Sequence, residues 1–264
     1  MRHSASTSSA ARSTGFTLVE LLVVIGIIAV LIGILLAALS GARAQARMLK
    51  CVTNLRSLGQ GMSAYIAEFQ QYPLPDTSPR DGGQVLWPVA LYERLGGAGA
   101  TEIWLCPERP ANYGWPDFRG QPPQFGSFGG GQGFSYGFNS LGNDDGYRTT
   151  GFRGLTGVDG RGHPINLHVG RVKAPAEMIA ITDATTLHDP PFVPDCLTIV
   201  PYPPVQGFGS LRLYQPTGIH RGDQLNVLFC DGHVVTMYRK EIILPAPGNH
   251  TNPIGRLWNH NNRP

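Results

Sequence analysis

Hydrophobic positions are concentrated near the N-terminus of the chain. Leu21–Leu39 contains no charged residue, and the Ser- and Thr-rich segment before Phe16 carries Arg2 and Arg12 but no acidic residue. A helix rises about 1.5 Å per residue, so a run of about 20 apolar residues crosses a hydrocarbon core of about 30 Å. The pattern therefore predicts a membrane-spanning helix, and a plain signal anchor is the simplest explanation that composition allows.

The hydrophobic pattern becomes amphipathic after Ser40. Apolar residues then recur at steps of three and four, which is typical of a helix with one buried face. This apolar stripe comprises Leu49, Val52, Leu55, Leu58, Met62, Tyr65, Ile66 and Phe69. Tyr72-Pro73 marks the expected end of the helix. We therefore expect one long helix over residues 16–72, whose second half packs against a globular head in residues 73–264.

Short runs of β-branched and aromatic residues predict strands in the head. The clearest candidates are 177–183, 225–230 and 233–238, with weaker ones at 101–109 and 168–173. An Asp-Gly pair, Asp231-Gly232, joins two of these runs and predicts a hairpin with a type I′ turn, which needs a positive φ at both positions. The C-terminal half is therefore expected to be mostly antiparallel sheet.

Glycine and proline shape the rest of the head. The chain has 34 Gly and 22 Pro, well above their usual combined share of about 12%. We expect a short helix within residues 83–97, a Gly/Pro-rich irregular insertion over 110–165, and a tail after Leu244 that wraps the surface or is loose. Charged residues make up only 15% of the chain and the net charge is +3, which excludes a coiled-coil rod and gives no indication of nucleic-acid binding.

One charge stands at the start of the apolar run. Glu20 follows Phe16 by four residues, and an ionisable group in a membrane segment costs several kcal/mol unless it is paired. A cut between Gly15 and Phe16 would create an α-amino group, which is the natural partner of this carboxylate. Glu20 is thus a candidate functional residue.

The stretch Gly15-Phe16-Thr17-Leu18-Val19-Glu20, followed by the apolar run, resembles the class III signal of type IV prepilins and type II secretion pseudopilins. The resemblance implies that prepilin peptidase removes residues 1–15 as a leader, that Phe16 becomes the N-methylated N-terminus, and that Glu20 acts in assembly. It also implies a transmembrane segment at 16–39. The head would then lie on the periplasmic side of the cytoplasmic (inner) membrane, and the partners would be other pilin or pseudopilin subunits.

Two details of the N-terminal segment depart from this picture. Arg43, Arg47 and Lys50 follow the apolar run, so counting of positive charges favours a cytoplasmic C-terminal side. We follow the motif, because a basic amphipathic continuation is usual in prepilins. The proline that the family often carries in this helix is absent from Leu35–Leu39, so no kink is expected there.

The segment from His220 to Gly232 resembles the H-X9-DG motif of the prepilin-type processing-associated domain, with one residue more between His220 and Asp231 than the motif has. Asp183, His220, Asp231 and His233 form a candidate set of ligands for calcium or another divalent metal, if they converge at one end of the sheet. The alternative is a structural hydrogen-bond cluster, since Asp231 is already explained as a turn residue. Otherwise no cofactor is expected.

Four cysteines, Cys51, Cys106, Cys196 and Cys230, allow three disulfide pairings, and the sequence does not choose among them. Disulfides are permitted if the head lies outside the cytoplasm. Cys51–Cys106 would join the long helix to the head, and Cys196–Cys230 would join parts of the late sheet. Free buried thiols are the alternative.

Together these patterns predict an α+β, pilin-like protein: a long N-terminal membrane-spanning helix packed on an antiparallel β-sheet head. We expect a structural subunit of a type II secretion pseudopilus or a type IV pilus-like filament. The alternative is a membrane-anchored cell-envelope module, exported by the prepilin route, that binds a carbohydrate or a secreted substrate. An enzyme is not expected, because the sequence contains no recognised catalytic motif.

Overall fold

The computed structural model describes residues 17–74, 87–108, 135–140, 142, 154–158, 164–184, 198–199, 213–214, 216, 218–244 and 252–261. By its internal contacts the chain forms two compact units, Met1–Arg43 and Ala44–Pro264. Helix α1, Leu18–Phe69, passes through the boundary between them. The boundary between the two units thus falls inside helix α1. The sequence pattern places the boundary between helix and head at the end of the helix instead.

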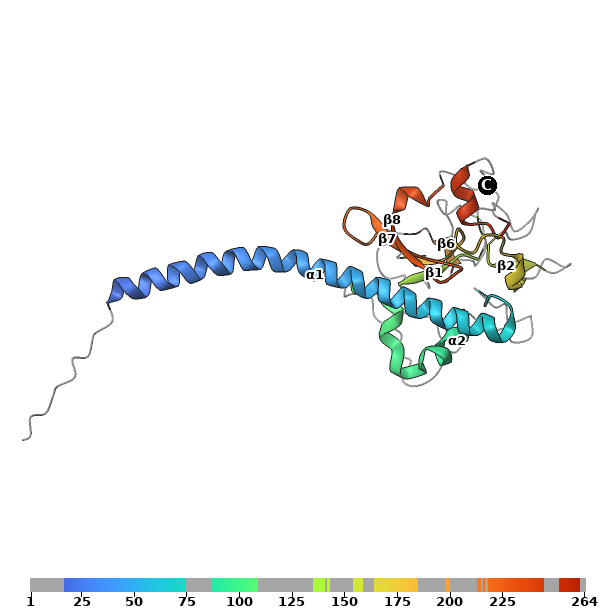
Figure 1. Ribbon diagram of the computed structural model, residues 1–264, viewed down its shortest axis with the longest axis horizontal. Coiled ribbons are helices and arrows are strands. Elements are labelled where there is room, and N and C mark those ends of the chain that lie inside the picture. Colours follow the sequence, from blue (N-terminus) through green and yellow to red (C-terminus); the bar gives the residue numbers. More distant parts are fainter. Residues whose placement is uncertain are drawn as a thin grey trace, which may run out of the picture. The chain divides into compact units, whose positions relative to one another are not determined.

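The head unit is built on the second half of α1 (Figure 1). Cys51, Leu55, Leu58 and Met62 are buried there and share one hydrophobic cluster with residues of the sheet. The expected stripe is thus confirmed at its centre. It is wrong at its edges: Leu49 and Phe69 are 56% and 46% exposed, because the buried face is rotated towards Cys51 and Asn54.

Helix α1 ends three residues earlier than Tyr72, and its backbone explains why. Gln70 has a left-handed φ of 57°, which ends the helical path after Phe69. The chain then turns into an extended segment: Gln71 forms a bridge with His168, and the Tyr72 N–H donates to the Leu167 carbonyl at 2.9 Å. The turn brings Tyr72 into the core, where it is 1% exposed.

The head contains a six-stranded sheet with the order β6-β5-β1-β4-β7-β8. Pairs β1/β4, β4/β7 and β7/β8 are antiparallel, whereas β5 runs parallel to both β1 and β6. The strands are β1 Tyr136–Phe138, β4 Ile179–Asp183, β5 Thr198–Ile199, β6 Leu213–Tyr214, β7 Gln224–Phe229 and β8 Val234–Tyr238. A separate antiparallel pair joins β2 Thr156–Val158 to β3 Pro164–Asn166. The expected α+β fold with an antiparallel sheet is confirmed.

Both faces of strand β7 are buried. Leu228 belongs to the cluster that contains the α1 residues, whereas Leu225, Val227 and Phe229 belong to a second cluster with Trp258. The second cluster is covered from the C-terminal part of the chain, which includes the 3₁₀ helices η4 Arg239–Glu241 and η5 Pro253–Leu257. Residues 252–261 of the tail therefore form part of the head, while 245–251 lie outside the described residues.

The β7–β8 hairpin is confirmed, but its turn differs from the prediction. Leu228 pairs with Val234, so the chain reverses over Cys230, Asp231 and Gly232. Among the loop residues only Gly232 has a positive φ, 94°, and its N–H donates to the Phe229 carbonyl at 2.9 Å. This is a three-residue loop with a left-handed glycine, and not a type I′ turn.

Two weaker strand predictions are wrong. Residues 101–104 end a 3₁₀ helix, η2 Gly97–Trp104, which follows α2 Trp87–Tyr92 and η1 Glu93–Leu95. Residues 169–171 form another short 3₁₀ helix, η3 Val169–Arg171. Short apolar runs fit a helix turn as well as a strand; in η2 the turn lets the Trp104 ring pack 5.7 Å from the ring of Trp87. The expected short helix within 83–97 is confirmed, and most of the insertion at 110–165 lies outside the described residues.

Candidate functional site

The start of helix α1 carries a capping box. The Glu20 N–H donates to Thr17 Oγ1 at 3.2 Å, and the Thr17 N–H donates to Glu20 Oε2 at 2.9 Å. The Thr17 hydroxyl donates to the same carboxylate oxygen at 2.6 Å. These reciprocal bonds satisfy two N–H groups that a helix start leaves open. The carboxylate of Glu20 is thereby held at the N-terminal end of the helix, while Gly15 and Phe16 lie outside the described residues.

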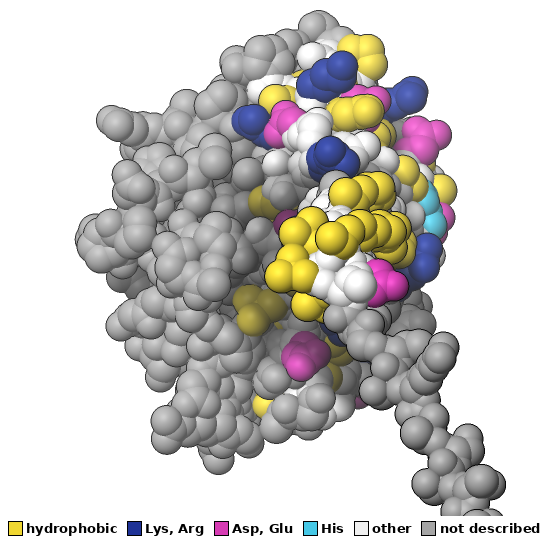
Figure 2. Space-filling view, turned by 90° about the vertical axis from the view of Figure 1, so that its left-hand side faces the viewer, with side chains coloured by type: hydrophobic (Ala, Val, Ile, Leu, Met, Phe, Trp, Pro, Cys, Tyr) yellow, Lys and Arg dark blue, Asp and Glu magenta, His cyan; other side chains and the backbone are white. Residues whose placement is uncertain are grey.

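The helix beyond Glu20 exposes hydrophobic side chains on all of its faces. The most exposed of these is Leu35, at 66%, and a view from the N-terminal side of the molecule shows such side chains gathered together (Figure 2). By length and composition, α1 is the one helix among the described residues that could cross a membrane. A surface of this kind is stable only in lipid or against other apolar helices.

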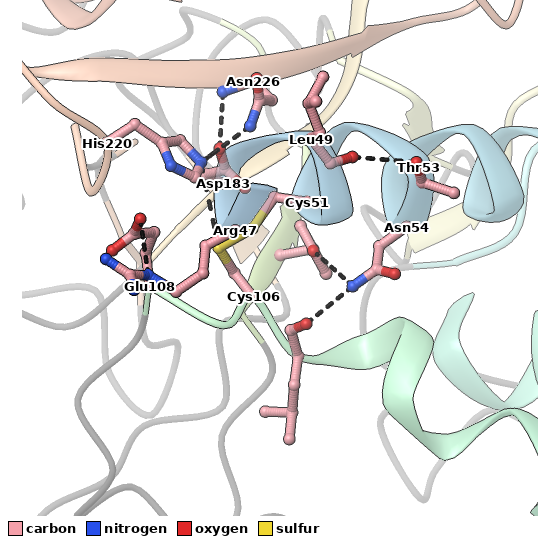
Figure 3. The surroundings of a disulfide bond; sticks show 12 residues. Arg47, Leu49, Cys51, Thr53, Asn54, Cys106, Glu108, Asp183, His220 and Asn226 are labelled. Atoms are coloured by element: carbon pink, nitrogen blue, oxygen red, sulfur yellow. Dashed lines mark hydrogen bonds and ion pairs between the residues drawn. A yellow bond between two sulfur atoms is a disulfide. The ribbon is translucent and has the colours of Figure 1, made fainter. Parts of the chain in front are cut away.

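A disulfide bond joins α1 to the segment that follows η2. Cys51 and Cys106 are bonded with an S–S distance of 2.04 Å and a Cα–Cα distance of 5.2 Å (Figure 3). Both side chains are buried. Cys230, in contrast, is a free thiol, which agrees with the alternative of free thiols and not with a Cys196–Cys230 bond. Cys196 itself lies outside the described residues.

Polar contacts reinforce this junction on both sides of the disulfide. The buried amide of Asn54 donates to the Leu105 carbonyl at 2.8 Å and to the Tyr136 hydroxyl at 3.2 Å. On the other side, Arg47 Nε lies 3.0 Å from Glu108 Oε1. Asn54 belongs to α1, so its side chain connects this helix both to the segment that contains Leu105 and to strand β1.

A buried Asp–His pair lies beside the disulfide. His220 Nε2 is 3.0 Å from Asp183 Oδ2 and 4.0 Å from Cys106 Sγ, and the side chains of His220 and Asp183 are 1% and 0% exposed (Figure 3). The Asn226 N–H donates to the same Asp183 oxygen at 2.6 Å. The side-chain amide of Asn226 lies 2.8 Å from His220 Nε2. Asp183, at the end of β4, is thus held between His220 and the start of β7.

Burial acts on the ionisation of Asp183. Desolvation raises the pKa of Asp183, and the hydrogen bonds and charge of His220 together with the bonds from Asn226 oppose that rise. Asp183 Oδ1 and His220 Nδ1 have no hydrogen-bond partner among the residues the structure describes. The pair therefore keeps unused donor and acceptor capacity inside the core.

The four residues of the expected metal set do not converge. Asp231 and His233 form their own exposed pair, with Oδ1 and Nδ1 2.5 Å apart, and the His233 ring stacks on Phe229. They follow β7, whereas His220 precedes it and forms a bridge with Gln224. The two pairs therefore lie at opposite ends of strand β7, so the convergence on which the candidate four-residue metal site depended does not occur.

Three polar residues of these sites were not among the sequence candidates. Thr17 stands three residues before Glu20 and just before an apolar run, which is the sequence pattern of a capping box and would have identified it. Asn54 falls on the buried face of α1 next to Cys51, where its partners Leu105 and Tyr136 are distant in sequence. Asn226 lies inside an apolar strand, and a lone asparagine there gives no signal of the carboxylate that it contacts.

Comparison with known proteins gives a match to the N-terminal segment. A family model described as a prokaryotic N-terminal methylation motif matches residues 11–36, which include Gly15, Phe16 and Glu20. The motif indicates a substrate of a type IV prepilin-type peptidase and implies assembly with pilin subunits, and with helix α1 it fits a membrane-anchored, single-pass protein. No curated protein and no solved structure matches the chain.

Proposed function

We infer that this protein is a structural, non-enzymatic subunit of a type II secretion pseudopilus or a type IV pilus-like filament. The observation that carries the inference is the first half of α1, which exposes hydrophobic side chains on every face and carries Glu20 as its sole charge between Leu18 and Leu39. In the membrane this surface contacts lipid, and in a filament it packs against the same helices of neighbouring subunits. The head stays on the periplasmic side of the cytoplasmic membrane.

Glu20 supplies the polar contact of the assembly step. Its carboxylate is turned towards the helix start by Thr17, which is where a chain cut after Gly15 has its new α-amino group. A methylated Phe16 amine from a neighbouring subunit then pairs with Glu20 in a medium of low dielectric constant, where an unpaired charge costs several kcal/mol. The pairing therefore stabilises a subunit that is packed into the filament at the correct axial position, relative to a subunit that remains in lipid.

The first test concerns processing. The intact mass and N-terminal residue of the membrane-extracted protein are measured in cells with and without an active prepilin peptidase. We expect a chain that begins with N-methylated Phe16 only when the peptidase is active. An uncut chain, or a cut at another position, would make α1 a plain signal anchor.

The second test concerns assembly. Glu20→Ala and Glu20→Gln both remove the charge, and Glu20→Gln keeps the size of the side chain. We expect both variants to remain in the membrane fraction and to be lost from sheared filaments, with the Cys51–Cys106 bond formed as in the parent. Val19→Ala, which changes a neighbouring exposed residue, serves as the matched control. Filaments that contain the Glu20 variants at the parent level would contradict the proposed role.

We also propose that the segment from His220 to Gly232 is a variant of the H-X9-DG motif with a structural role in the head. Its two ends have different structural roles: His220 is buried against Asp183, and Asp231-Gly232 form part of the β7–β8 loop. A His220→Ala variant should therefore lower the stability of the head without changing cleavage after Gly15. A defect in cleavage would overturn this assignment.

A further inference from the structure

Three side chains with metal-binding chemistry meet at the disulfide, and one of them, His220, also belongs to the metal set that the sequence indicated. The sulfurs of Cys51 and Cys106 and a ring nitrogen of His220 all lie within 4.8 Å of one another. The carboxylate of Asp183 is the next neighbour of His220, with Oδ2 3.0 Å from His220 Nε2 (Figure 3). We propose that the reduced form of the protein binds one zinc ion through Cys51, Cys106, His220 and Asp183.

The ligand types select a zinc-like ion. Two thiolates, one imidazole and one carboxylate are a soft-to-borderline set that suits tetrahedral Zn²⁺, whereas calcium takes six to eight oxygen ligands. All four side chains are buried, as in a closed structural site that has no open coordination position. Calcium, which the sequence also allowed, does not fit this cluster.

For the two sulfurs and His220, the distances require only small movements once the disulfide is reduced. In a tetrahedral site with Zn–S bonds of about 2.3 Å and Zn–N bonds of about 2.0 Å, two sulfurs are about 3.8 Å apart and a sulfur and a nitrogen about 3.5 Å apart. Cys106 Sγ and His220 Nε2 are already 4.0 Å apart. Two sulfurs that are no longer bonded must separate to about a van der Waals distance in any case. Reduction alone therefore moves them towards the spacing that zinc requires.

The hydrogen bonds around the cluster leave ligand atoms available. Asp183 Oδ2 lies beside His220 Nε2, and Oδ1 has no partner among the described residues, so the carboxylate has an oxygen free to turn towards a cation while the other keeps the N–H of Asn226. His220 Nε2 faces Asp183, Asn226 and Cys106, so its lone pair is directed into the cluster when the proton is on Nδ1. A divalent cation would also offset the two thiolate charges in a buried place, where unpaired charges are costly.

The ligands come from four separate parts of the fold. Cys51 lies in α1, Cys106 follows η2, Asp183 ends β4 and His220 precedes β7. A bound ion would therefore hold together the same elements that the disulfide joins, with two more added. Because the disulfide and the ion use the same sulfurs, the two states exclude each other, and only the reduced protein binds metal.

Cobalt(II) gives a direct test, because tetrahedral thiolate-bound Co²⁺ has intense visible bands. We would purify the full chain in detergent from a Cys196→Ser/Cys230→Ser background, which removes the two other thiols, and titrate it with Co²⁺ before and after reduction by a phosphine. The reduced chain should show the thiolate–cobalt bands at one equivalent, Zn²⁺ should displace them, and the oxidised chain should show none. A reduced chain without these bands would overturn the proposal.

The two other ligands are tested in the same background. We expect His220→Ala and Asp183→Ala each to weaken Zn²⁺ binding by more than the roughly 10- to 100-fold cost of losing an outer-shell partner. His233→Ala, which changes an exposed histidine at the other end of β7, is the matched control and should leave binding unchanged. Zn²⁺ should also slow alkylation of Cys51 and Cys106 in the unmutated reduced chain, a measurement that needs no ligand variant. Unchanged affinity in both ligand variants would show that the cysteines bind metal without His220 and Asp183.

Discussion

Removal of the Cys51–Cys106 bond should destabilise the head by a large and calculable amount. The bonded residues are 55 positions apart in sequence. The chain-entropy relation for closing a loop of that length gives about 4 kcal/mol at 25 °C, and native disulfides in small domains contribute about 2–5 kcal/mol. We therefore expect the Cys51→Ala/Cys106→Ala variant to lose about 2–4 kcal/mol of unfolding free energy.

Denaturant unfolding in detergent measures this loss. Trp87, Trp104 and Trp258 are buried in the head, so their fluorescence reports its unfolding, and a chelator in all buffers keeps metal from replacing the bond. Cys230→Ala, which removes a thiol outside the disulfide, is the matched control. A loss below about 1 kcal/mol in the double variant would refute the reasoning, because it would mean that the bond removes little entropy from the unfolded chain or that strain in the folded state offsets the gain.

Three further changes test other parts of the structure. Asn54→Leu should cost about 1–3 kcal/mol, because it leaves the Leu105 carbonyl without its side-chain donor; the exposed neighbour Thr53→Ala should change stability by less than about 0.5 kcal/mol in the same unfolding assay. Gly154→Ala should destabilise the head by about 1–3 kcal/mol or more, since a Cβ there would lie 2.4 Å from the backbone of Ser140; Gly41→Ala, with nothing within 4 Å of its Cβ, should leave head stability unchanged. Thr17→Val should lower filament yield relative to Thr17→Ser, because only serine preserves the hydroxyl bond to Glu20; equal yields would show that the capping box has no part in assembly.

The elements with strong periodicity could be predicted from the sequence. Helix α1 has a long apolar run followed by three- and four-residue spacing, and β7 and β8 are β-branched runs joined by Asp231-Gly232. These signals are local in the sequence, so they can be recognised without knowledge of the fold. The turn type was missed because Asp-Gly also fits a three-residue loop in which only the glycine is left-handed.

The arrangement of the polar residues could not be predicted in the same way. Asp183 reaches His220 because β4 and β7 are neighbouring antiparallel strands, which puts the end of β4 beside the start of β7. Asp231 follows β7, so it lies at the other end of this strand. Sequence spacing contains no information about which strands are neighbours, and only that pairing separates the buried Asp–His pair from the exposed one.

The position of Leu228 in the core has a consequence for biogenesis. Leu55, Leu58 and Met62 of α1 share their hydrophobic cluster with this late residue of β7. Asn139, which follows β1, donates to the carbonyl of Trp258, another late residue. At ribosomal rates of about 5–20 residues per second, on the order of 10–30 s separate synthesis of the helix from synthesis of these partners. The apolar face of the second half of α1 is therefore synthesised long before the residues that cover it in the folded head.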